Sequence, residues 1–399
     1  MTRLSIVIPA YNEEGGIAGI AERVLAVGPS LTQVGVDDLE VMVVDDGSRD
    51  RTAEIAGAVP GVRLVRHAHN RGYGAALKTG FHQTRGDLVG FLDADGTYPP
   101  EWFPQLCTVA LNGADLVIGS RMAGSDSRMP VTRRVGNWLF AGLLSLLGDR
   151  RITDSASGMR VFKREILERL YPLPDGLNLT PVMSVRAIHE GVRMAEVAIP
   201  YEERVGRSKL NVLRDGSTFL QSILWTAMSY NPVRILGSIG LLGVGLAALV
   251  GVGLVVTRLR GVTDLGSWGV VALFGGVVAG VSGISIFGLG ATFNYLVTLF
   301  HRQPVRQGLF GRPVFDPPLE HHFGWIGAGL LLVGALLGGV SLVLGMQGWG
   351  LVRLWLYLLG SAMLVLVGVQ LMVSWILVRV LGELSRRETL ASRDLRGTW

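Results

Sequence analysis

The stretch that decides the fold is Leu88-Val89-Gly90-Phe91-Leu92-Asp93-Ala94-Asp95. Its apolar part, 88–92, predicts a buried strand of a parallel sheet. Open α/β sheets bind ligands at the carboxyl ends of their strands, which is where Asp93 and Asp95 fall. Carboxylates favour hard cations, and Mg²⁺ or Mn²⁺ held by one or two carboxylates commonly also binds substrate phosphates. The pair is therefore a candidate metal–diphosphate site, with a solvated turn as the plain alternative.

The rest of the amino-terminal half alternates between strand-like and helix-like patterns. The other stretches that predict strands are Leu4–Ile8, Glu40–Val44, Val62–Arg66 and Leu116–Ile118. Helical patterns occupy the intervals, at Glu14–Val27, Arg51–Ala58, Ala75–Thr84 and Glu101–Asn112. Alternation of this kind predicts an α/β fold with a doubly wound, mostly parallel sheet.

Polar loops follow the first, second and fourth of these strands. They read Pro9-Ala10-Tyr11-Asn12-Glu13-Glu14, Asp45-Asp46-Gly47-Ser48 and Asp93-Ala94-Asp95-Gly96. We expect the three loops to line one crevice, because the carboxyl ends of parallel strands meet at one edge of a sheet. A dinucleotide enzyme would need a glycine-rich turn after the first strand, and Gly72-Tyr73-Gly74 is only a fragment of that fingerprint after the third. A bound diphosphate would then be neutralised by a metal ion and by Arg or Lys side chains.

The carboxyl-terminal half is of a different kind. Four runs in it, 235–257, 268–300, 323–352 and 354–378, contain no Asp, Glu, Lys or Arg. Each exceeds the roughly 20 residues that cross a hydrocarbon core of about 30 Å. We therefore predict transmembrane helices at about 235–257, 268–300, 323–346 and 354–378. The pairs Gly276/Gly280 and Gly334/Gly338 would let helices approach closely, within one chain or in a homo-oligomer, although chance spacing among 55 glycines would also produce them.

The predicted domain order is a cytoplasmic α/β domain, a juxtamembrane amphipathic helix, the four spans and a basic cytoplasmic tail, at 1–209, 210–232, 233–380 and 381–399. The amino terminus reads as a strand rather than a signal peptide, because polar residues follow it at once. An even number of spans then places both termini in the cytoplasm. Arginines of the 302–312 loop and of the tail fit this orientation under the positive-inside rule, whereas Arg258, Arg260 and Arg353 oppose it.

Composition argues against several classes of function. Cys107 is the only cysteine, which excludes an intramolecular disulfide and a cysteine metal cluster. The net charge of +5 comes without a basic–aromatic pattern, so we expect no nucleic-acid partner. None of the seven histidines has the partners of a zinc site. No Asp, Glu, Lys or Arg marks a path through any predicted span, which argues against a transporter or flippase with a regulatory soluble half.

Ordered motifs in residues 4–215 resemble glycosyltransferase family 2. They are Ser5-Ile6-Val7-Ile8-Pro9-Ala10-Tyr11-Asn12-Glu13-Glu14, Val44-Asp45-Asp46-Gly47-Ser48-x-Asp50-x-Thr52, Asn70-x-Gly72, Asp93-Ala94-Asp95 and Gly119-Ser120-Arg121. Two later motifs resemble its polyprenyl-phosphate branch, the dolichol-phosphate mannose synthases and related hexosyltransferases: Asp154-x-x-Ser157-Gly158-Met159-Arg160 and Arg204-x-Gly206-x-Ser208-Lys209. The resemblance implies a GT-A fold and inverting transfer of a hexose, mannose before glucose. The implied substrates are GDP-mannose or UDP-glucose and polyprenyl or dolichyl phosphate.

On the donor side, the resemblance implies that the nucleoside is held by Pro9, Ala10, Tyr11, Glu13 and one or both of Asp45 and Asp46. An aromatic ring can cover a base, and carboxylates accept hydrogen bonds from base N–H groups or ribose hydroxyls. Lys78 is a candidate diphosphate contact, with a solvated helix lysine as the alternative.

The metal, Mg²⁺ or Mn²⁺, is expected at Asp93-Ala94-Asp95, with Asp95 the stronger candidate for direct ligation. A divalent ion bridging the diphosphate would neutralise charge on the leaving group. Many relatives have Gln two residues after the second Asp, whereas Thr97 stands here. Water could therefore take the place of a third side-chain ligand.

On the acceptor side, the resemblance associates the basic cluster Arg121, Arg133 and Arg134, near Asn137, with the lipid phosphate. Guanidinium groups match phosphate bidentately, although a solvated patch or a headgroup contact would use the same residues. Arg204 and Lys209 are expected in a loop that closes over the phosphates. We assign the chemistry itself to Asp93, Asp95, Arg121 and Arg134.

The acceptor decides whether a base is needed. A phosphate monoester is already anionic near pH 7, whereas a sugar hydroxyl needs a general base. The Gln-x-x-Arg-Trp motif of processive polysaccharide synthases is absent. The alternative is a glycosyltransferase acting on a lipid or glycan hydroxyl, in which Asp154 would be either the base or a structural residue.

Two segments are expected to bring the site to the bilayer. Val135–Leu147 is apolar but too short to span, and Leu210–Tyr230 places apolar residues at helical spacing among charges. Both predict amphipathic helices at the membrane interface, with buried core helices as the alternative. A lipid acceptor would require such helices, because its phosphate lies at headgroup depth.

Overall fold

The structure, a computed structural model, describes residues 1–122, 129–147, 151–202, 212–262, 266–301 and 319–396. The chain forms two compact units, Met1–Ala227 and Met228–Trp399. Unit 1 contains every strand of the described residues, and unit 2 contains the long apolar helices.

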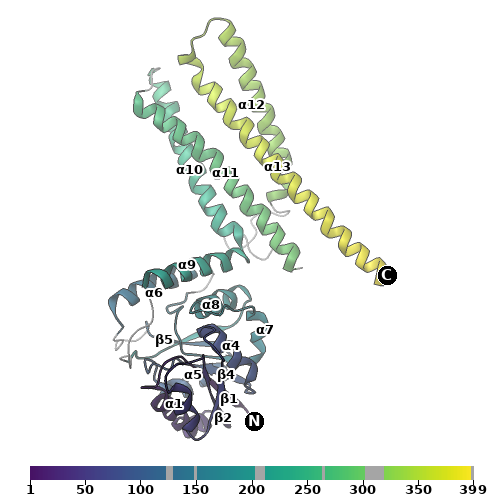
Figure 1. Cartoon of the computed structure of the whole chain (residues 1–399). Coiled ribbons are helices and arrows are strands. Elements are labelled where there is room, and N and C mark those ends of the chain that lie inside the picture. The colour runs from purple at the N-terminus through teal and green to yellow at the C-terminus, as the bar shows by residue number, and fades with distance from the viewer. Residues whose placement is uncertain (123–128, 148–150, 203–211, 263–265, 302–318, 397–399) are drawn as a thin grey trace. The chain divides into compact units, whose positions relative to one another are not determined.

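Unit 1 is built around a seven-stranded sheet with the order β3-β2-β1-β4-β6-β5-β7 (Figure 1). The strands are β1 (Arg3–Ala10), β2 (Asp38–Asp45), β3 (Val62–Arg66), β4 (Leu88–Phe91), β5 (Leu116–Ser120), β6 (Arg160–Lys163) and β7 (Met194–Ala198). The pairs β1–β2, β1–β4, β2–β3 and β5–β7 are parallel, and β6 runs antiparallel between β4 and β5. The predicted mostly parallel α/β sheet is confirmed.

Two strands, β6 and β7, were not predicted. β6 has only four residues, and two of them are Arg160 and Lys163, which do not give an apolar run. β7 contains Met, Ala and Glu, which have little preference for strands, and it is only half-buried. Tertiary packing rather than local sequence places both in the sheet.

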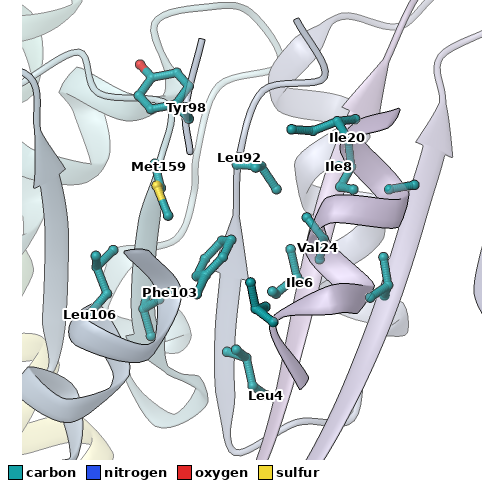
Figure 2. Packing of buried hydrophobic residues seen from close by; sticks show 14 of the residues in the cluster. Leu4, Ile6, Ile8, Ile20, Val24, Leu92, Tyr98, Phe103, Leu106 and Met159 are labelled. Atoms are coloured by element: carbon teal, nitrogen blue, oxygen red, sulfur yellow. The ribbon is translucent and has the colours of Figure 1, made fainter. Parts of the chain in front are cut away.

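Helices cover both faces of the sheet. On one face lie α1 (Ile17–Ala26), α2 (Gly28–Gln33), α3 (Thr52–Ala58) and α5 (Phe103–Leu111), the last preceded by the short 3-10 helix Pro100–Trp102. On the other lie α4 (Tyr73–Gln83), α7 (Leu167–Leu170), which follows the 3-10 helix Arg164–Ile166, and α8 (Leu179–His189). Both faces of the sheet need such a cover because alternate side chains of a strand point to opposite faces, as β1 shows. Ile6 and Ile8 pack with Ile20 and Val24 of α1 (Figure 2), whereas Val7 packs on the opposite face.

Two further helices of unit 1, α6 (Val131–Leu147) and α9 (Val212–Met228), correspond to the predicted amphipathic segments. They contact each other through the rings of Phe140 and Phe219, whose centroids are 6.0 Å apart. Both also carry exposed large apolar side chains, namely Val131, Val135, Trp138, Leu139 and Leu146 on α6 and Leu220 and Trp225 on α9. These helices are therefore not simply buried core elements.

Unit 2 consists of α10 (Pro232–Leu259), α11 (Ser267–His301), the 3-10 helix Leu319–His322, α12 (Phe323–Met346) and α13 (Leu351–Arg396). Four stretches are long and apolar enough to cross a membrane, as predicted: Pro232–Leu259, Ser267–Val297, Phe323–Met346 and Arg353–Leu384. The predicted basic tail continues α13 as a helix to Arg396.

Glycines bring the helices of unit 2 into close contact. A Cβ added at Gly283 of α11 would lie 2.6 Å from the carbonyl oxygen of Gly240 in α10. In the same way, Gly338 of α12 faces Ser361 of α13, whose hydroxyl donates to the carbonyl of Gly334 at 2.9 Å. The predicted close approach at Gly334/Gly338 is therefore present within one chain.

Candidate active site

A cavity of about 580 Å³ lies at the carboxyl ends of the strands of unit 1. It is lined by the loops after β1, β2 and β4, by Arg121 after β5, and by residues of α6 and α9. The strand register explains this convergence, because β1 and β2 end level, with Ala10 paired to Asp45, and the neighbouring β4 ends at Phe91, opposite Val7 near the same end of β1. The volume lies within the roughly 300–1,000 Å³ that is usual for small-molecule sites. The three polar loops thus line one crevice, as expected.

The first two loops contribute part of the predicted nucleoside site. The predicted residues that line the cavity are Pro9, Ala10, Tyr11, Glu13 and Asp46. Asp45 is not among the lining residues: it is fully buried, and its Oδ1 accepts the backbone N–H of Ser48 at 3.2 Å. Its Oδ2 lies 3.2 Å from Nε of Arg66. Of the two aspartates left open by the sequence, the structure brings Asp46 to the cavity.

Asp46 also organises the loop after β3. Its Oδ1 lies 2.7 Å from Nδ1 of His67, in a pair that is almost fully buried. The same carboxylate accepts the backbone N–H groups of Arg71 at 2.9 Å and of Gly72 at 2.8 Å. The side chain therefore fixes the approach of the chain to Tyr73, the first residue of α4.

Asp93 lies in the cavity wall between a tyrosine and a glycine. The hydroxyl of Tyr73 donates to its Oδ1 at 2.8 Å. On another side, a Cβ added at Gly158 would lie 2.6 Å from Cγ of Asp93. The glycine of the Asp154-x-x-Ser157-Gly158-Met159-Arg160 motif is thus explained by space: only a residue without a side chain leaves room for this carboxylate.

Asp95 is buried at the same wall and is oriented by Thr97. Its Oδ1 accepts both the hydroxyl of Thr97 at 2.6 Å and the backbone N–H of Thr97 at 3.1 Å. The threonine that replaces the family's glutamine is therefore bonded to Asp95. Within the described ranges, no three His, Cys, Asp or Glu residues are grouped so that they could hold a metal. Two carboxylates fit a Mg²⁺ or Mn²⁺ ion that takes its other ligands from a diphosphate and water.

Arg121 is held on three sides. Its Nε and Nη2 donate to Oδ2 and Oδ1 of Asp154 at 2.7 and 2.8 Å. Its guanidinium lies over the rings of Tyr98 and Tyr201, 5.5 and 5.9 Å from the centroids. Its side chain is 13 % exposed and still lines the cavity. It can therefore present a fixed positive charge to an anion.

The pairing determines the charge state of Asp154. Burial alone would raise the pKa of this carboxyl, but the attraction and hydrogen bonds of Arg121 outweigh burial and hold the pKa below its ordinary value. For Arg121, burial would lower the pKa, and Asp154, together with Tyr98 and Asp93, more than reverses this. Both groups therefore stay ionised near neutral pH. A carboxylate in this state is a poor proton acceptor.

The remaining predicted acceptor residues divide between the cavity and the surface. Nη1 of Arg133 donates to the hydroxyl of Tyr201 at 3.1 Å, and Arg133 lines the cavity. Asn137 is buried in the same wall, where its Nδ2 donates to the carbonyl of Thr153 at 3.3 Å. Arg134 is exposed and is not among the lining residues. The structure thus joins Arg121, Arg133 and Asn137 in one wall and leaves Arg134 outside it.

Lys78 is another predicted residue, and it is not brought to the cavity. Nζ of Lys78 lies 2.6 Å from the carboxylate of Asp175 and donates to the carbonyl of Leu173 at 2.8 Å. Lys78 lines a separate hollow rather than the main cavity. Arg204 and Lys209 lie outside the described residues.

Three tyrosines of the cavity were missed by sequence reasoning. Tyr73 stood in a motif that matched only a fragment of a dinucleotide fingerprint. Tyr98 lies beyond Asp93-Ala94-Asp95, and its hydroxyl accepts the backbone N–H of Gly158 at 2.7 Å. Tyr201 follows β7, a strand that was not predicted. Only Tyr73 had a signal in the sequence that could have found it, the pair of glycines around it.

Comparison with known proteins identifies the family. Glycosyl transferase family 2 matches residues 5–171, and a domain of unknown function, DUF8752, matches residues 232–392. The chain is 32 % identical over 221 residues to the dolichyl-phosphate hexose transferase of Haloferax volcanii, covering 55 % of this chain and 92 % of that protein. It is 30 % identical over 303 residues to the undecaprenyl-phosphate 4-deoxy-4-formamido-L-arabinose transferase of Aeromonas hydrophila, covering 74 % and 89 %. The chain belongs to glycosyltransferase family 2.

Two further similarities are partial. The chain is 35 % identical over 234 residues to the low-salt glycan biosynthesis hexosyltransferase Agl6 of Haloferax volcanii, and it spans about half of that relative, 54 % of its length. Among solved structures, it resembles glucosyl-3-phosphoglycerate synthase from Mycobacterium tuberculosis, with 25 % identity, a TM-score of 0.43, and coverage of 57 % of this chain and 80 % of that one.

Proposed function

We propose that this chain transfers a hexose, with inversion, from a nucleotide diphosphate sugar to the phosphate of a polyprenol or dolichol. The observation that carries the proposal is the composition of one cavity. The same cavity is lined by Asp93, Asp95, Arg121 and Arg133. A donor diphosphate with its metal fits the carboxylates, and an anionic acceptor fits the arginines.

The relatives support the acceptor more strongly than the sugar. One is named for dolichyl phosphate and hexose, another for undecaprenyl phosphate and a modified arabinose. The acceptor class, a polyprenyl phosphate, is common to both names, whereas the sugars differ. For this chain we propose mannose first and glucose next, with GDP-mannose or UDP-glucose as the donor.

On the donor side, Tyr11 and Glu13 would contact the nucleoside, and Asp46 would hold the loop that closes this end of the cavity. Asp93 and Asp95 would bind Mg²⁺ or Mn²⁺, which when bound neutralises charge on the departing diphosphate. The buried position of Asp95 and the half-buried position of Asp93 support this role, because little water competes there. The bond between the anomeric carbon and the diphosphate breaks as the acceptor oxygen bonds to the opposite face of the sugar.

On the acceptor side, Arg121 and Arg133 would bind the lipid phosphate. Tyr201 links them, since its ring lies against Arg121 and its hydroxyl accepts from Arg133. Asp154, the candidate base for a hydroxyl acceptor, is already bound to Arg121 and has a lowered pKa. This favours an acceptor that needs no base over a lipid or glycan hydroxyl.

The two amphipathic helices of unit 1, α6 and α9, support a lipid acceptor. Trp138 and Trp225 are exposed on α6 and α9, the helices that also supply part of the cavity wall. Exposed tryptophans on amphipathic helices are typical of membrane interfaces. With the four spans of unit 2, we propose a multi-pass membrane protein whose catalytic domain and both termini are cytoplasmic.

A donor panel tests the proposal. Membranes containing the protein would be incubated with polyprenyl phosphate and, in turn, radiolabelled GDP-mannose, UDP-glucose and other nucleotide sugars. We expect label in the lipid phase with one donor, and mannose as that sugar. Label in an unphosphorylated lipid or glycan instead would support the hydroxyl-acceptor alternative.

A further inference from the structure

The hydroxyl of Tyr73 is aimed at a carboxylate of the site. It donates to Oδ1 of Asp93 at 2.8 Å from the first residue of α4. We propose that Tyr73 is a positioning residue that holds Asp93 in the orientation needed by the donor diphosphate and its metal ion. This inference rests on the donor side of the proposed function, and it concerns a residue that touches Asp93 rather than the reacting atoms.

Tyr73 is the hydrogen-bond donor in this contact. Its hydroxyl lies 2.8 Å from Oδ1 of Asp93, and an ionised carboxylate can only accept. The contact is therefore a charge-assisted O–H to carboxylate hydrogen bond. Partners of this kind behind a ligating carboxylate fix its orientation, and their loss typically weakens metal binding by about 10- to 100-fold.

The backbone before Tyr73 is fixed as tightly as the side chain. Gly72 has φ of +105° and donates its N–H to Asp46 at 2.8 Å. A Cβ added at Gly72 would lie 2.5 Å from the carbonyl oxygen of Asp175, and the next turn is tied to the same carbonyl by the N–H of Ala75 at 3.1 Å. Both glycines of the Gly72-Tyr73-Gly74 motif pack against the 174–175 backbone. The motif therefore serves to place one tyrosine.

Asp93 has little room to turn. The tyrosine hydroxyl engages one of its oxygens, and the backbone at Gly158 closes the space on another side. Removing the hydroxyl would leave the half-buried carboxylate in place but with one restraint fewer. The expected consequence is a weaker metal site in a folded protein, not a loss of the fold.

The test compares two tyrosines of the same cavity. Full-length wild type, Tyr73→Phe and Tyr201→Phe would be purified in detergent, and Mn²⁺ binding would be measured by electron paramagnetic resonance in the presence of GDP or UDP. We expect the Mn²⁺ Kd of Tyr73→Phe to rise by about 10- to 100-fold. Tyr201→Phe is the matched control, because its hydroxyl accepts from Arg133, and its Mn²⁺ Kd should stay close to the wild-type value.

A double-mutant comparison separates positioning from general damage. If Tyr73 acts through Asp93, the effect of Tyr73→Phe on Mn²⁺ binding should shrink or vanish in an Asp93→Asn background. Should Tyr73→Phe not fold, Tyr73→Met fills the space without a hydroxyl and allows the same comparison.

Two results would count against the inference, and they differ in meaning. A wild-type Mn²⁺ Kd in Tyr73→Phe would overturn the role of Tyr73 and leave the proposed reaction intact. Absence of Mn²⁺ binding by the wild type with either nucleotide would overturn the metal part of the proposed function, and the inference with it. The measurement uses no acceptor, so it does not depend on the lipid assignment.

Discussion

Arg121 and Asp154 form a two-point ion pair, with Nε–Oδ2 and Nη2–Oδ1 distances of 2.7 and 2.8 Å. The carboxylate is fully buried, and it also accepts the backbone N–H of Arg121 at 3.0 Å. Asp154 therefore fixes both the side chain and the backbone of the arginine that faces the cavity. If Arg121 binds the acceptor phosphate, as proposed, the aspartate of the Asp154-x-x-Ser157-Gly158-Met159-Arg160 motif would act on the acceptor through this pair.

Replacing this aspartate tests the pair. Asp154→Asn should destabilise unit 1 by about 3–5 kcal/mol, because a buried guanidinium loses its counter-charge. Thermal melting of the purified protein would measure this. The pKa of the Asp154 carboxyl is lower in the folded protein than its ordinary value of about 4. The ion pair therefore contributes its full stability above about pH 4, and this contribution is lost only as the pH falls through the lowered pKa. Melting temperature should thus show no Asp154-dependent step between pH 5 and 8, and such a step would contradict the assignment.

The space beside Asp93 gives a second prediction. Gly158→Ala would place a methyl group against the Asp93 carboxylate, and we expect sugar transfer to fall by at least about 100-fold, as for a ligand displaced by about 1 Å. Gly142→Ala on α6 is the control, because nothing lies within 4 Å of its added Cβ. Initial rates of both variants would be compared with the wild type. Normal activity of Gly158→Ala would show that Asp93 need not occupy its position in the structure.

Two neighbouring arginines give a third prediction. Sequence reasoning assigned both Arg133 and Arg134 to the acceptor phosphate, but only Arg133 lines the cavity. Arg133→Ala should lose a charge-assisted contact worth on the order of 1.5–3 kcal/mol. This corresponds to about one to two decades in kcat/KM for the lipid. Arg134→Ala should change it much less, and equal losses in the two variants would place Arg134 in the site as well.

The sequence predicted the parts of the fold that depend on local pattern. The run 88–92 is continuous and apolar and the first two strands are mostly apolar, so their place in a parallel sheet follows from pattern and from the polar loops after them. The third strand, Val62–Arg66, could be predicted from apolar residues that are interrupted by arginines and from the alternation of strands and helices around it. β6 could not be found in this way, because Arg160 is fully buried in it, bonded to the carbonyls of Ser155 and Ser157 and to Ser184. A buried arginine is stable there because these oxygens accept its N–H groups, and one of the partners, Ser184, is 24 positions away along the chain.

The candidate site, like the fold, could be predicted from the sequence only in part. Motif position left Asp45 and Asp46 as alternatives and added Asp93, Asp95 and Arg121, which also follow strand ends. In the structure Asp46, Asp93, Asp95 and Arg121 line one cavity. Motif position could not separate Arg133 from Arg134, because that depends on the rotation of α6. It placed Lys78 with the diphosphate, whereas the structure pairs it with Asp175, a partner 97 positions away along the chain.

Orientation in the membrane is a fourth prediction. A reporter fused after Trp399, and one inserted in the 302–312 loop, should both report the cytoplasm, because four spans return the chain to its starting side and the loop is rich in arginine. The measurement is a paired fusion assay, with one reporter active only inside and the other only outside. An external signal at either position would mean that one of the four helices does not span.

The acceptor is the centre of the account, and one comparison tests it most directly. The purified protein, its metal and its preferred nucleotide sugar would be offered polyprenyl phosphate and the same polyprenol without the phosphate, in parallel. If Arg121 and Arg133 bind an acceptor phosphate that needs no general base, sugar should appear only on the phosphorylated lipid, as a phosphodiester that mild acid cleaves. Equal transfer to the unphosphorylated alcohol, or an acid-stable product, would contradict the account.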